Sequence, residues 1–392
     1  MQPLEGITVI ALEQAVAAPL ATRHLADLGA RIIKIERPGV GDFARGYDTT
    51  VCGISSHFVW LNRSKESLTL DVKAAEARDV LARLLSGADV FIQNLAPRAA
   101  ERLSLGAGEL RQKYPRLIVC SLSGYGASGP YRDKKAYDLL IQSEAGLLSI
   151  TGTEEEPSKA GISVADIAGG MYAYSAILTA LFMRQRTGQG TTIEVSLFEA
   201  LGEWMGYPAY YTKYGGKAPA RTGAAHAAIA PYGPFQSEDQ KPVFLSIQND
   251  REWERFCHVV LRRAELATDP RFESGPRRVA NRRDLHRAIE EVFSRLTAGD
   301  IVARLEEAQI ANGRMNSVQE FLEHPQLASR KRWRDIDSPV GKLSALIPPA
   351  DLAGVQPVMG PIPSLGQHTN VILNEIGFDA PTLAGWRQRG VI

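Results

Sequence analysis

One carboxylate, Asp166, stands among small residues in the segment 161–171. It ends a short β-like run and precedes an apolar helical pattern from Ile167 to about Met183, so it falls where a helix begins. Unpaired N–H groups and the positive end of the helix dipole favour an anion there, and we expect the carboxylate to stay ionised. The pattern predicts a nucleophile that needs no general base, although an ordinary N-cap aspartate fits it equally well.

Other motifs for catalysis or cofactor binding are weak or absent. Residues 124–129 have the glycine spacing of a dinucleotide fingerprint, but residues 131–135 offer no apolar helix face to pack on a sheet. The chain has no phosphate-binding loop, no Gly-x-Ser-x-Gly elbow and no metal-ligand spacing among its histidines. We therefore expect no metal and no permanently bound cofactor, and we keep an NAD-dependent oxidoreductase only as an alternative.

Strand and helix patterns alternate along the first two hundred residues. The expected strands are residues 7–12, 31–35, 67–72, 89–93, 117–123 and 191–196. The expected helices are residues 20–28, 73–85, 167–183 and a further one from about 197. This alternation is typical of an α/β sheet with helical crossovers, whose sites form at the C-terminal ends of the strands.

The pattern changes near residue 210, where linker-like residues 215–220 are followed by a short strand pair and helices near 252–260, 283–294 and 301–307. Trp253 and Phe256 are expected in the core of the first of these helices. We expect residues 1–210 to form an α/β domain and residues 225–325 a smaller α+β domain. Residues 330–392 are rich in proline and short strands and should close with helices near 369–376 and 380–389.

Composition indicates an ordinary globular protein. The 392 residues include 45 basic and 44 acidic side chains, so the net charge of +1 attracts neither nucleic acid nor an anionic membrane. Three scattered cysteines are typical of a reducing compartment, and we expect the cytoplasm. Since the first residues lack a signal-peptide pattern and no run of eighteen apolar residues occurs, we expect no membrane span.

Ordered motifs along nearly the whole chain resemble those of the class III CoA-transferases, the CaiB/BaiF family. They are LEGI (4–7), AAP (17–19), LADLGA (25–30), IKIERPG (33–39), NRSK (62–65), QN (93–94), Arg102, GYG (124–126), YD (137–138), the Asp166 segment, RTGQG (186–190) and LGQHT (365–369). The resemblance implies a large Rossmann-like domain built from both chain ends around a small central domain. It also implies two ring-like chains interlocked as a homodimer.

The reaction implied by the resemblance moves coenzyme A from an acyl-CoA donor to a carboxylate acceptor. It passes through aspartyl anhydride and aspartyl-CoA thioester states, and Asp166 matches the nucleophile. Because an anhydride hydrolyses readily, the site must exclude water. Flexible loops around Gly124 and Gly126, and around Gly223 and His226, could close over it. His226 could hydrogen-bond an acceptor carboxylate, although a structural histidine fits its position as well.

Coenzyme A carries phosphates, which basic side chains after strand ends should bind. The CoA-binding positions implied by the resemblance are Arg37, Lys73, Asn94, Arg102, Lys135, Tyr137 and Asp138. Gln14, after the first strand, could donate to an oxyanion. Some relatives carry their polar group where this chain has Val16, so the role of Gln14 stays open.

Acyl-CoA racemases of the same fold use a histidine directly before the aspartate that matches Asp138. This chain has Tyr137 there, and a phenol with a pKa of about 10 is a poor base for an α-proton at neutral pH. We therefore favour a CoA-transferase over a 2-methylacyl-CoA racemase or epimerase. A non-catalytic CoA-binding protein remains the alternative if Asp166 is idle.

The acceptor is expected from resemblance alone. Residues 221–226 and 229–232 are most similar to the branch that uses succinyl-CoA and short dicarboxylates of four to six carbons, such as itaconate, mesaconate or glutarate. They are less similar to the formyl-CoA:oxalate and carnitine branches. A second substrate carboxylate needs a cationic or hydrogen-bonding partner, which Arg221 and His226 could supply.

Overall fold

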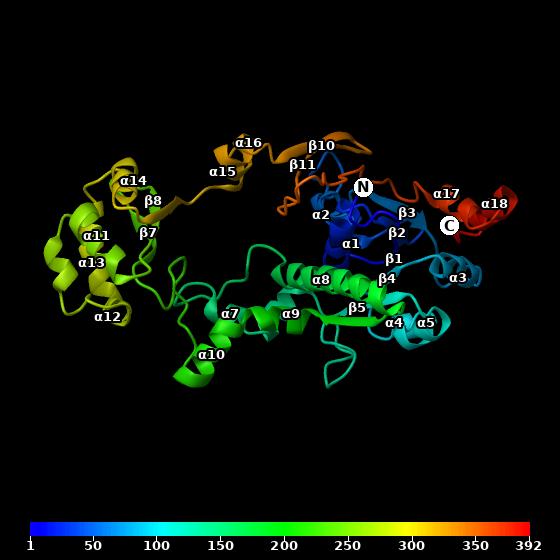
Figure 1. Ribbon diagram of the computed structural model, residues 1–392, viewed down its shortest axis with the longest axis horizontal. Coiled ribbons are helices and arrows are strands. Elements are labelled where there is room, and N and C mark those ends of the chain that lie inside the picture. The colour runs from blue at the N-terminus through cyan, green and yellow to red at the C-terminus, as the bar shows by residue number, and fades with distance from the viewer. The chain divides into compact units, whose positions relative to one another are not determined.

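The computed structural model describes all 392 residues and divides into two compact units (Figure 1). Unit 1 consists of Met1–Ala145, Ala160–Met205 and Leu327–Ile392, and unit 2 of Gly146–Lys159 and Gly206–Gln326. The sequence pattern did not separate residues 146–159 from the first 210. They join unit 2 because Arg221 donates to the carbonyl oxygens of Thr153 and Glu154, at 2.8 Å each, and Gly223 N–H donates to the Gly152 carbonyl.

Unit 1 is built on a six-stranded parallel sheet, which confirms the expected α/β class. The strands are β1 (Thr8–Leu12), β2 (Arg31–Glu36), β3 (Lys65–Thr69), β4 (Val90–Gln93), β5 (Ile118–Ser123) and β6 (Thr192–Ser196). Their order is β3-β2-β1-β4-β5-β6, so the direction of winding reverses between β1 and β4. In such sheets ligands bind beyond the C-terminal strand ends, at the point of reversal.

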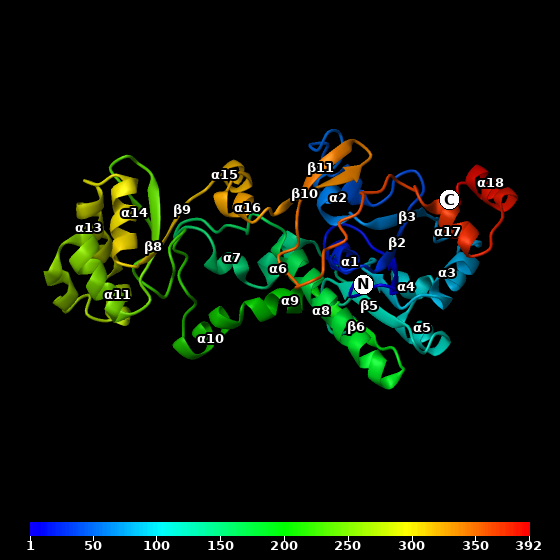
Figure 2. The ribbon, with the colours of Figure 1, turned by 45° about the horizontal axis from the view of Figure 1, so that its top comes forward.

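The helices of unit 1 cover both faces of this sheet. They are α1 (Ala17–Asp27), α2 (Ser56–Leu61), α3 (Ala77–Ser86), α4 (Ala99–Arg102), α5 (Ala107–Lys113), α6 (Asp138–Glu144), α8 (Val164–Thr187), α9 (Leu197–Trp204), α17 (Thr369–Glu375) and α18 (Ala380–Gln388), with a 3-10 turn, η1 (Phe43–Gly46). Ile10 and Phe91 of the sheet pack on α3, α5, α17 and α18 in the larger apolar core. On the other face α1 and α8 lie side by side (Figure 2).

Helix α8 begins after its N-cap residue Ser163 and ends at Gly188, whose φ of 71° stops it. A side chain at Gly170 would place its Cβ 2.6 Å from the Ala17 carbonyl oxygen, so this glycine allows α1 and α8 to approach closely. By length and composition α8 could also cross a bilayer, but core helices meet the same criterion and 44% of its apolar window is buried.

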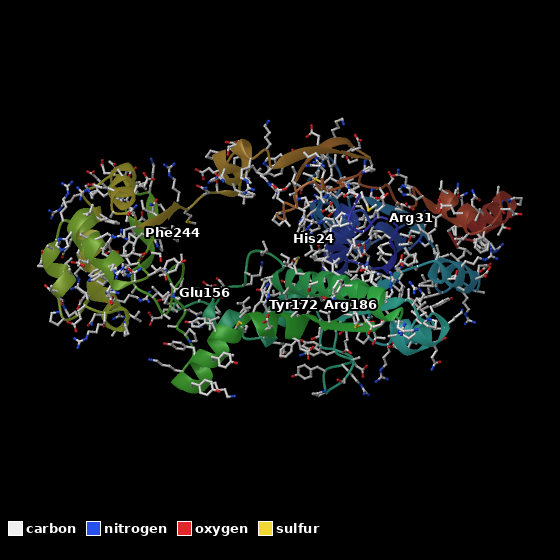
Figure 3. The ribbon with its side chains drawn as sticks, in the orientation of Figure 1. His24, Arg31, Glu156, Tyr172, Arg186 and Phe244 are labelled. Carbon is white, nitrogen blue, oxygen red and sulfur yellow. The ribbon has the colours of Figure 1, made fainter.

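The last part of the chain returns to the sheet of unit 1. Thr369 Oγ1 accepts a hydrogen bond from Thr69 N–H at 2.9 Å, next to β3. Arg31, which is labelled in Figure 3, forms ion pairs with Glu66 of β3 and Glu375 of α17. Residues 327–392 also supply an antiparallel hairpin, β10 (Trp333–Ser338) and β11 (Gly341–Leu346).

Unit 2 contains a three-stranded antiparallel sheet and several short helices. Its elements are α7 (Leu147–Ile150), α10 (Gly206–Gly215), β7 (Tyr232–Gln236), β8 (Pro242–Ser246), α11 (Asp250–Arg255), a π-helical turn η2 (Phe256–Leu261), a 3-10 turn η3 (Ala264–Thr268), α12 (Gly275–Ala280), α13 (Arg282–Phe293), α14 (Ala298–Glu307), β9 (Ala311–Arg314) and α15 (Val318–Leu322), and α16 (Pro325–Ser329) leads back to unit 1. Trp253 and Phe256 are fully buried in its core, as expected.

Several element boundaries expected from the sequence are wrong. The helices expected at 20–28 and 167–183 begin at Ala17 and Val164, and two further differences have a clear cause. The third strand occupies Lys65–Thr69 rather than 67–72, because the Lys65 side chain is buried against Glu13 and so occupies an interior strand position. The helix expected at 73–85 begins at Ala77, since Asp71 Oδ1 accepts from Lys73 N–H and forms a turn before it.

Candidate active site

A cavity of about 1160 Å³ opens at the C-terminal edge of the parallel sheet. Its walls are the loops that follow β1, β2, β3, β4 and β5, together with Asp166 from α8. All of these residues belong to unit 1. The cavity therefore lies where the reversal of strand order predicts a ligand site.

Asp166 lies in the first turn of α8 rather than before it, and the N-cap is Ser163. Its side chain lines the cavity, and no protein group donates a hydrogen bond to its carboxylate. Burial, and second the negative charge of Asp138, raise the pKa of Asp166 to about 7. This raised pKa runs against the expectation of a fully ionised carboxylate, because burial disfavours the charged form.

Asp138, at the start of α6, holds the beginning of α8. Its Oδ1 accepts from Ala165 N–H at 2.8 Å and from Asp166 N–H at 3.4 Å, while Oδ2 accepts from the Gln142 side chain at 2.6 Å. Gln142 is fully buried and accepts in turn from Ala160 N–H. Asp138 does not line the cavity, so its contacts favour support of Asp166 over direct contact with CoA.

The basic residues expected to bind CoA are brought together at the cavity. Those that line it without any ion-pair partner are Arg37, Lys73, Arg102 and Lys135. Every other cation of the wall is neutralised: Arg98 and Arg132 pair with Asp133, and Lys134 pairs with Glu144. The sequence expectation thus coincides with the unpaired positive charges of the cavity, which can bind phosphate groups.

Asn94, Tyr137, Gly124 and Gly126 also line the cavity. The Asn94 side chain is occupied by the backbone of Gln14, which it both accepts from and donates to. Tyr137 is two-thirds exposed. A Cβ at Gly124 would lie 2.3 Å from that of Ala136, and Gly126 has a φ of 88°, so both glycines are required by the shape of this loop.

Gly223 and His226 belong to unit 2, and their role at the cavity stays a prediction. His226 Nδ1 accepts from Ala228 N–H at 3.1 Å, and its ring stacks on Tyr232 with centroids 5.2 Å apart. Its Nε2 makes no hydrogen bond within the protein. Because Arg221 already donates two bonds to backbone carbonyls, His226 is the freer of the two groups expected to meet an acceptor carboxylate.

Sequence reasoning missed Tyr47, which lines the cavity just after η1. Burial and the negative charges of Asp42 and Asp166 raise its pKa to about 12, so the phenol stays protonated and can donate a hydrogen bond. It also missed the buried carboxylates Glu13 and Asp42 in the cavity wall. Tyr47 follows no strand and belongs to no recognisable motif. Lys34, a charge inside an apolar strand pattern, was a signal for the two carboxylates, because a buried lysine needs anionic partners.

Comparisons with known proteins identify the family of this chain. A family model described as CoA-transferase family III matches residues 4–369. An acetyl-CoA:oxalate CoA-transferase of Acetobacter aceti is 37% identical over 330 residues, 84% of either chain. A succinyl-CoA:glutarate CoA-transferase of Homo sapiens is 30% identical, over 96% of this chain and 86% of the relative.

Solved structures lead to the same family. A CAIB/BAIF family protein from Brucella suis superposes with a TM-score of 0.82 and 33% identity, covering 96% of this chain and 99% of that one. The family expected from the sequence motifs is confirmed. With a matching family model over nearly its whole length and relatives of this similarity, the protein belongs to CoA-transferase family III.

Proposed function

We propose that this protein transfers CoA from succinyl-CoA to a short dicarboxylate, with Asp166 as the nucleophile. The observation that carries the proposal is a carboxylate without hydrogen-bond donors in a cavity that also holds four unpaired cations. The cations suit the phosphates of CoA, and the carboxylate suits attack on its thioester.

The reaction needs no external base in this scheme. The Asp166 carboxylate attacks the thioester carbonyl, forms an anhydride and expels the CoA thiolate. The thiolate then attacks the aspartyl carbonyl, which releases the donor acid and leaves an aspartyl-CoA thioester. An acceptor carboxylate reverses the two steps and leaves as its CoA ester, so that Asp166 returns unchanged. Only the ionised form of Asp166 can begin these steps. Its raised pKa therefore makes the rate depend on pH near neutrality.

The CoA site can be tested by removing its cations one at a time. Arg37→Ala and Arg102→Ala should each raise the Kd for CoA by about tenfold or more, since a hydrogen bond to a charged group contributes about 1.5–3 kcal/mol. Isothermal titration with free CoA measures this. Arg132→Ala is the matched control, because Arg132 is already paired with Asp133 and should leave the Kd nearly unchanged. Unaltered affinity in both test variants would refute the assignment.

The dicarboxylate class of the acceptor is supported by the two relatives, which are a glutarate and an oxalate CoA-transferase. Both are dicarboxylates, of different lengths. We propose an acceptor of four to six carbons and expect His226 to contribute to binding its second carboxylate.

A transfer assay with succinyl-CoA and a panel of acids tests the function. Glutarate, itaconate and mesaconate should exceed butyrate and valerate in kcat/KM by at least about tenfold, which is about 1.4 kcal/mol of transition-state preference. Oxalate as the preferred acceptor would overturn the proposed chain length. Monocarboxylates preferred by tenfold would contradict the dicarboxylate assignment as a whole.

A further inference from the structure

The turn between β1 and α1, residues 13–17, is held by side chains from two other loops. Asn94, after β4, accepts from Gln14 N–H at 2.9 Å and donates to the Gln14 carbonyl at 2.8 Å. Asp42, after β2, accepts from Ala15 N–H at 3.0 Å. Ala15 has a φ of 64°, a conformation that residues other than glycine rarely adopt. Strain of this kind persists only where the surroundings impose it.

Buried charges extend this support to both ends of the turn. Glu13 Oε1 accepts from Lys65 Nζ at 2.7 Å, and Lys65 also donates to the Pro19 carbonyl at 3.0 Å. Lys34 Nζ lies 2.7 Å from Asp42 Oδ2 and 3.4 Å from Glu13 Oε1. All four charged side chains are at most 3% exposed. Because such buried pairs add little net stability, their arrangement is better explained by the geometry that they impose on the turn.

The side chain of Gln14 is the one polar group of this turn left unused. Its backbone is bound on both sides by Asn94, but its carboxamide makes no hydrogen bond within the protein. It lines the same cavity as Asp166. Gln14 precedes α1 and Asp166 lies in the first turn of α8, and these two helices pack closely where Gly170 meets Ala17. The Gln14 carboxamide and the Asp166 carboxylate thus line one cavity, and the packing of α1 on α8 fixes the elements that carry them.

We propose that the Gln14 carboxamide is a catalytic donor that binds the oxyanion formed when the thioester carbonyl is attacked, and that Asn94 and Asp42 position it. This inference rests on the proposed function. As Asp166 bonds to the carbonyl carbon, the carbonyl oxygen becomes negative and a side-chain N–H of Gln14 donates to it. When the tetrahedral state collapses, the oxygen regains its double bond and the thiolate leaves. Gln14 neither gains nor loses a proton, since a neutral amide acts through its dipole.

Steady-state kinetics on purified full-length variants test the donor. Gln14→Ala should lower kcat with succinyl-CoA by about a hundredfold, as the loss of one oxyanion donor does, while KM changes by less than about threefold. Gln14→Glu keeps the size but replaces the donor by an anion, and it should lose at least as much. A kcat within threefold of the parent in Gln14→Ala would overturn the inference. Absence of turnover in the parent with every acid would overturn the proposed function and the inference with it.

A double-mutant cycle tests the positioning role of Asn94. Asn94→Ala should lower kcat nearly as much as Gln14→Ala, and the double variant should be little worse than either, because both changes remove the same interaction. Asn94→Asp keeps the acceptor for Gln14 N–H and should recover part of kcat, which also guards against a misfolded Asn94→Ala. Losses that multiply in the double variant, or a rise in KM without a fall in kcat, would refute positioning.

Discussion

Asp166→Ala is expected to lower kcat for CoA transfer by at least about a thousandfold, the scale on which removal of a covalent nucleophile acts. No neighbouring carboxylate can replace it, because Glu13 and Asp42 are held in buried ion pairs. The remaining wall carboxylates lie on β2, α4 and β6 or in loops rather than at the start of α8. The loss should therefore appear in kcat with every donor and acceptor.

Trapping distinguishes a covalent role from a structural one. Incubation with succinyl-CoA followed by hydroxylamine or borohydride, then peptide mass spectrometry, should mark the peptide that contains Asp166. Glu101→Ala removes another carboxylate from the same cavity wall and serves as the control that keeps turnover and labelling. An unmodified Asp166 peptide together with full activity in Asp166→Ala would refute covalent catalysis.

The rate should also depend on pH through Asp166. Because its pKa is raised to about 7, kcat/KM should rise as pH increases from 5.5 to 8.5 and level off once the carboxylate is ionised. Asp138→Asn removes the nearby negative charge while its amide oxygen can still accept from Ala165 N–H. The rise should then occur at lower pH. Asp133→Asn, which changes a carboxylate paired with Arg98, should leave the profile in place.

The same shift has a consequence for stability. The pKa in the folded protein lies above the ordinary value of 3.8, so the contribution of Asp166 to folding is fully present below pH 3.8 and is lost as pH rises through about 7. Asp166→Asn cannot ionise and should raise the free energy of unfolding at pH 8 by about 2–4 kcal/mol, at about 1.4 kcal/mol per unit of pKa. Denaturant titration at pH 5 and pH 8 measures the difference. A variant that is no more stable at pH 8 would contradict the burial of a charged group.

The presence of α8 was predictable because its apolar periodicity is a local feature of the sequence, although the helix begins at Val164 rather than at the expected Ile167. The raised pKa of Asp166 was not predictable. Burial of the carboxylate, its main cause, depends on tertiary packing, and Asp138 lies 28 residues earlier and approaches it through the packing of α6 on α8. In the same way, Arg37 and Arg102 could be selected as basic residues after strands. Their lack of ion pairs depends on where Asp133 and Glu144 are placed by the fold.

Buried charges explain why the bounds of β3 were predicted wrongly. Lys65 is the first residue of β3, and its side chain is buried. Burial of this charge is acceptable only because Glu13, directly after β1, pairs with it. A hydropathy pattern that treats every lysine as exposed therefore places the start of this strand after Lys65. The support of the 13–17 turn by Asn94 and Asp42 is likewise invisible in sequence, since the bonds join loops 80 and 27 residues apart.

Unit 1 is assembled from three stretches of chain, and this affects how the protein folds during synthesis. Asp71 N–H donates to the Val391 carbonyl, and Leu383 and Trp386 fill the core beneath the sheet. The strands of the sheet thus leave the ribosome long before α17 and α18, which complete the cover of this face. Unit 2 has all of its residues by position 326 and can complete its own core first. Until residues 369–391 emerge, this apolar face of the nascent sheet is covered by α3 and α5 but not yet by α17 and α18, which is the interval in which a chaperone would matter most.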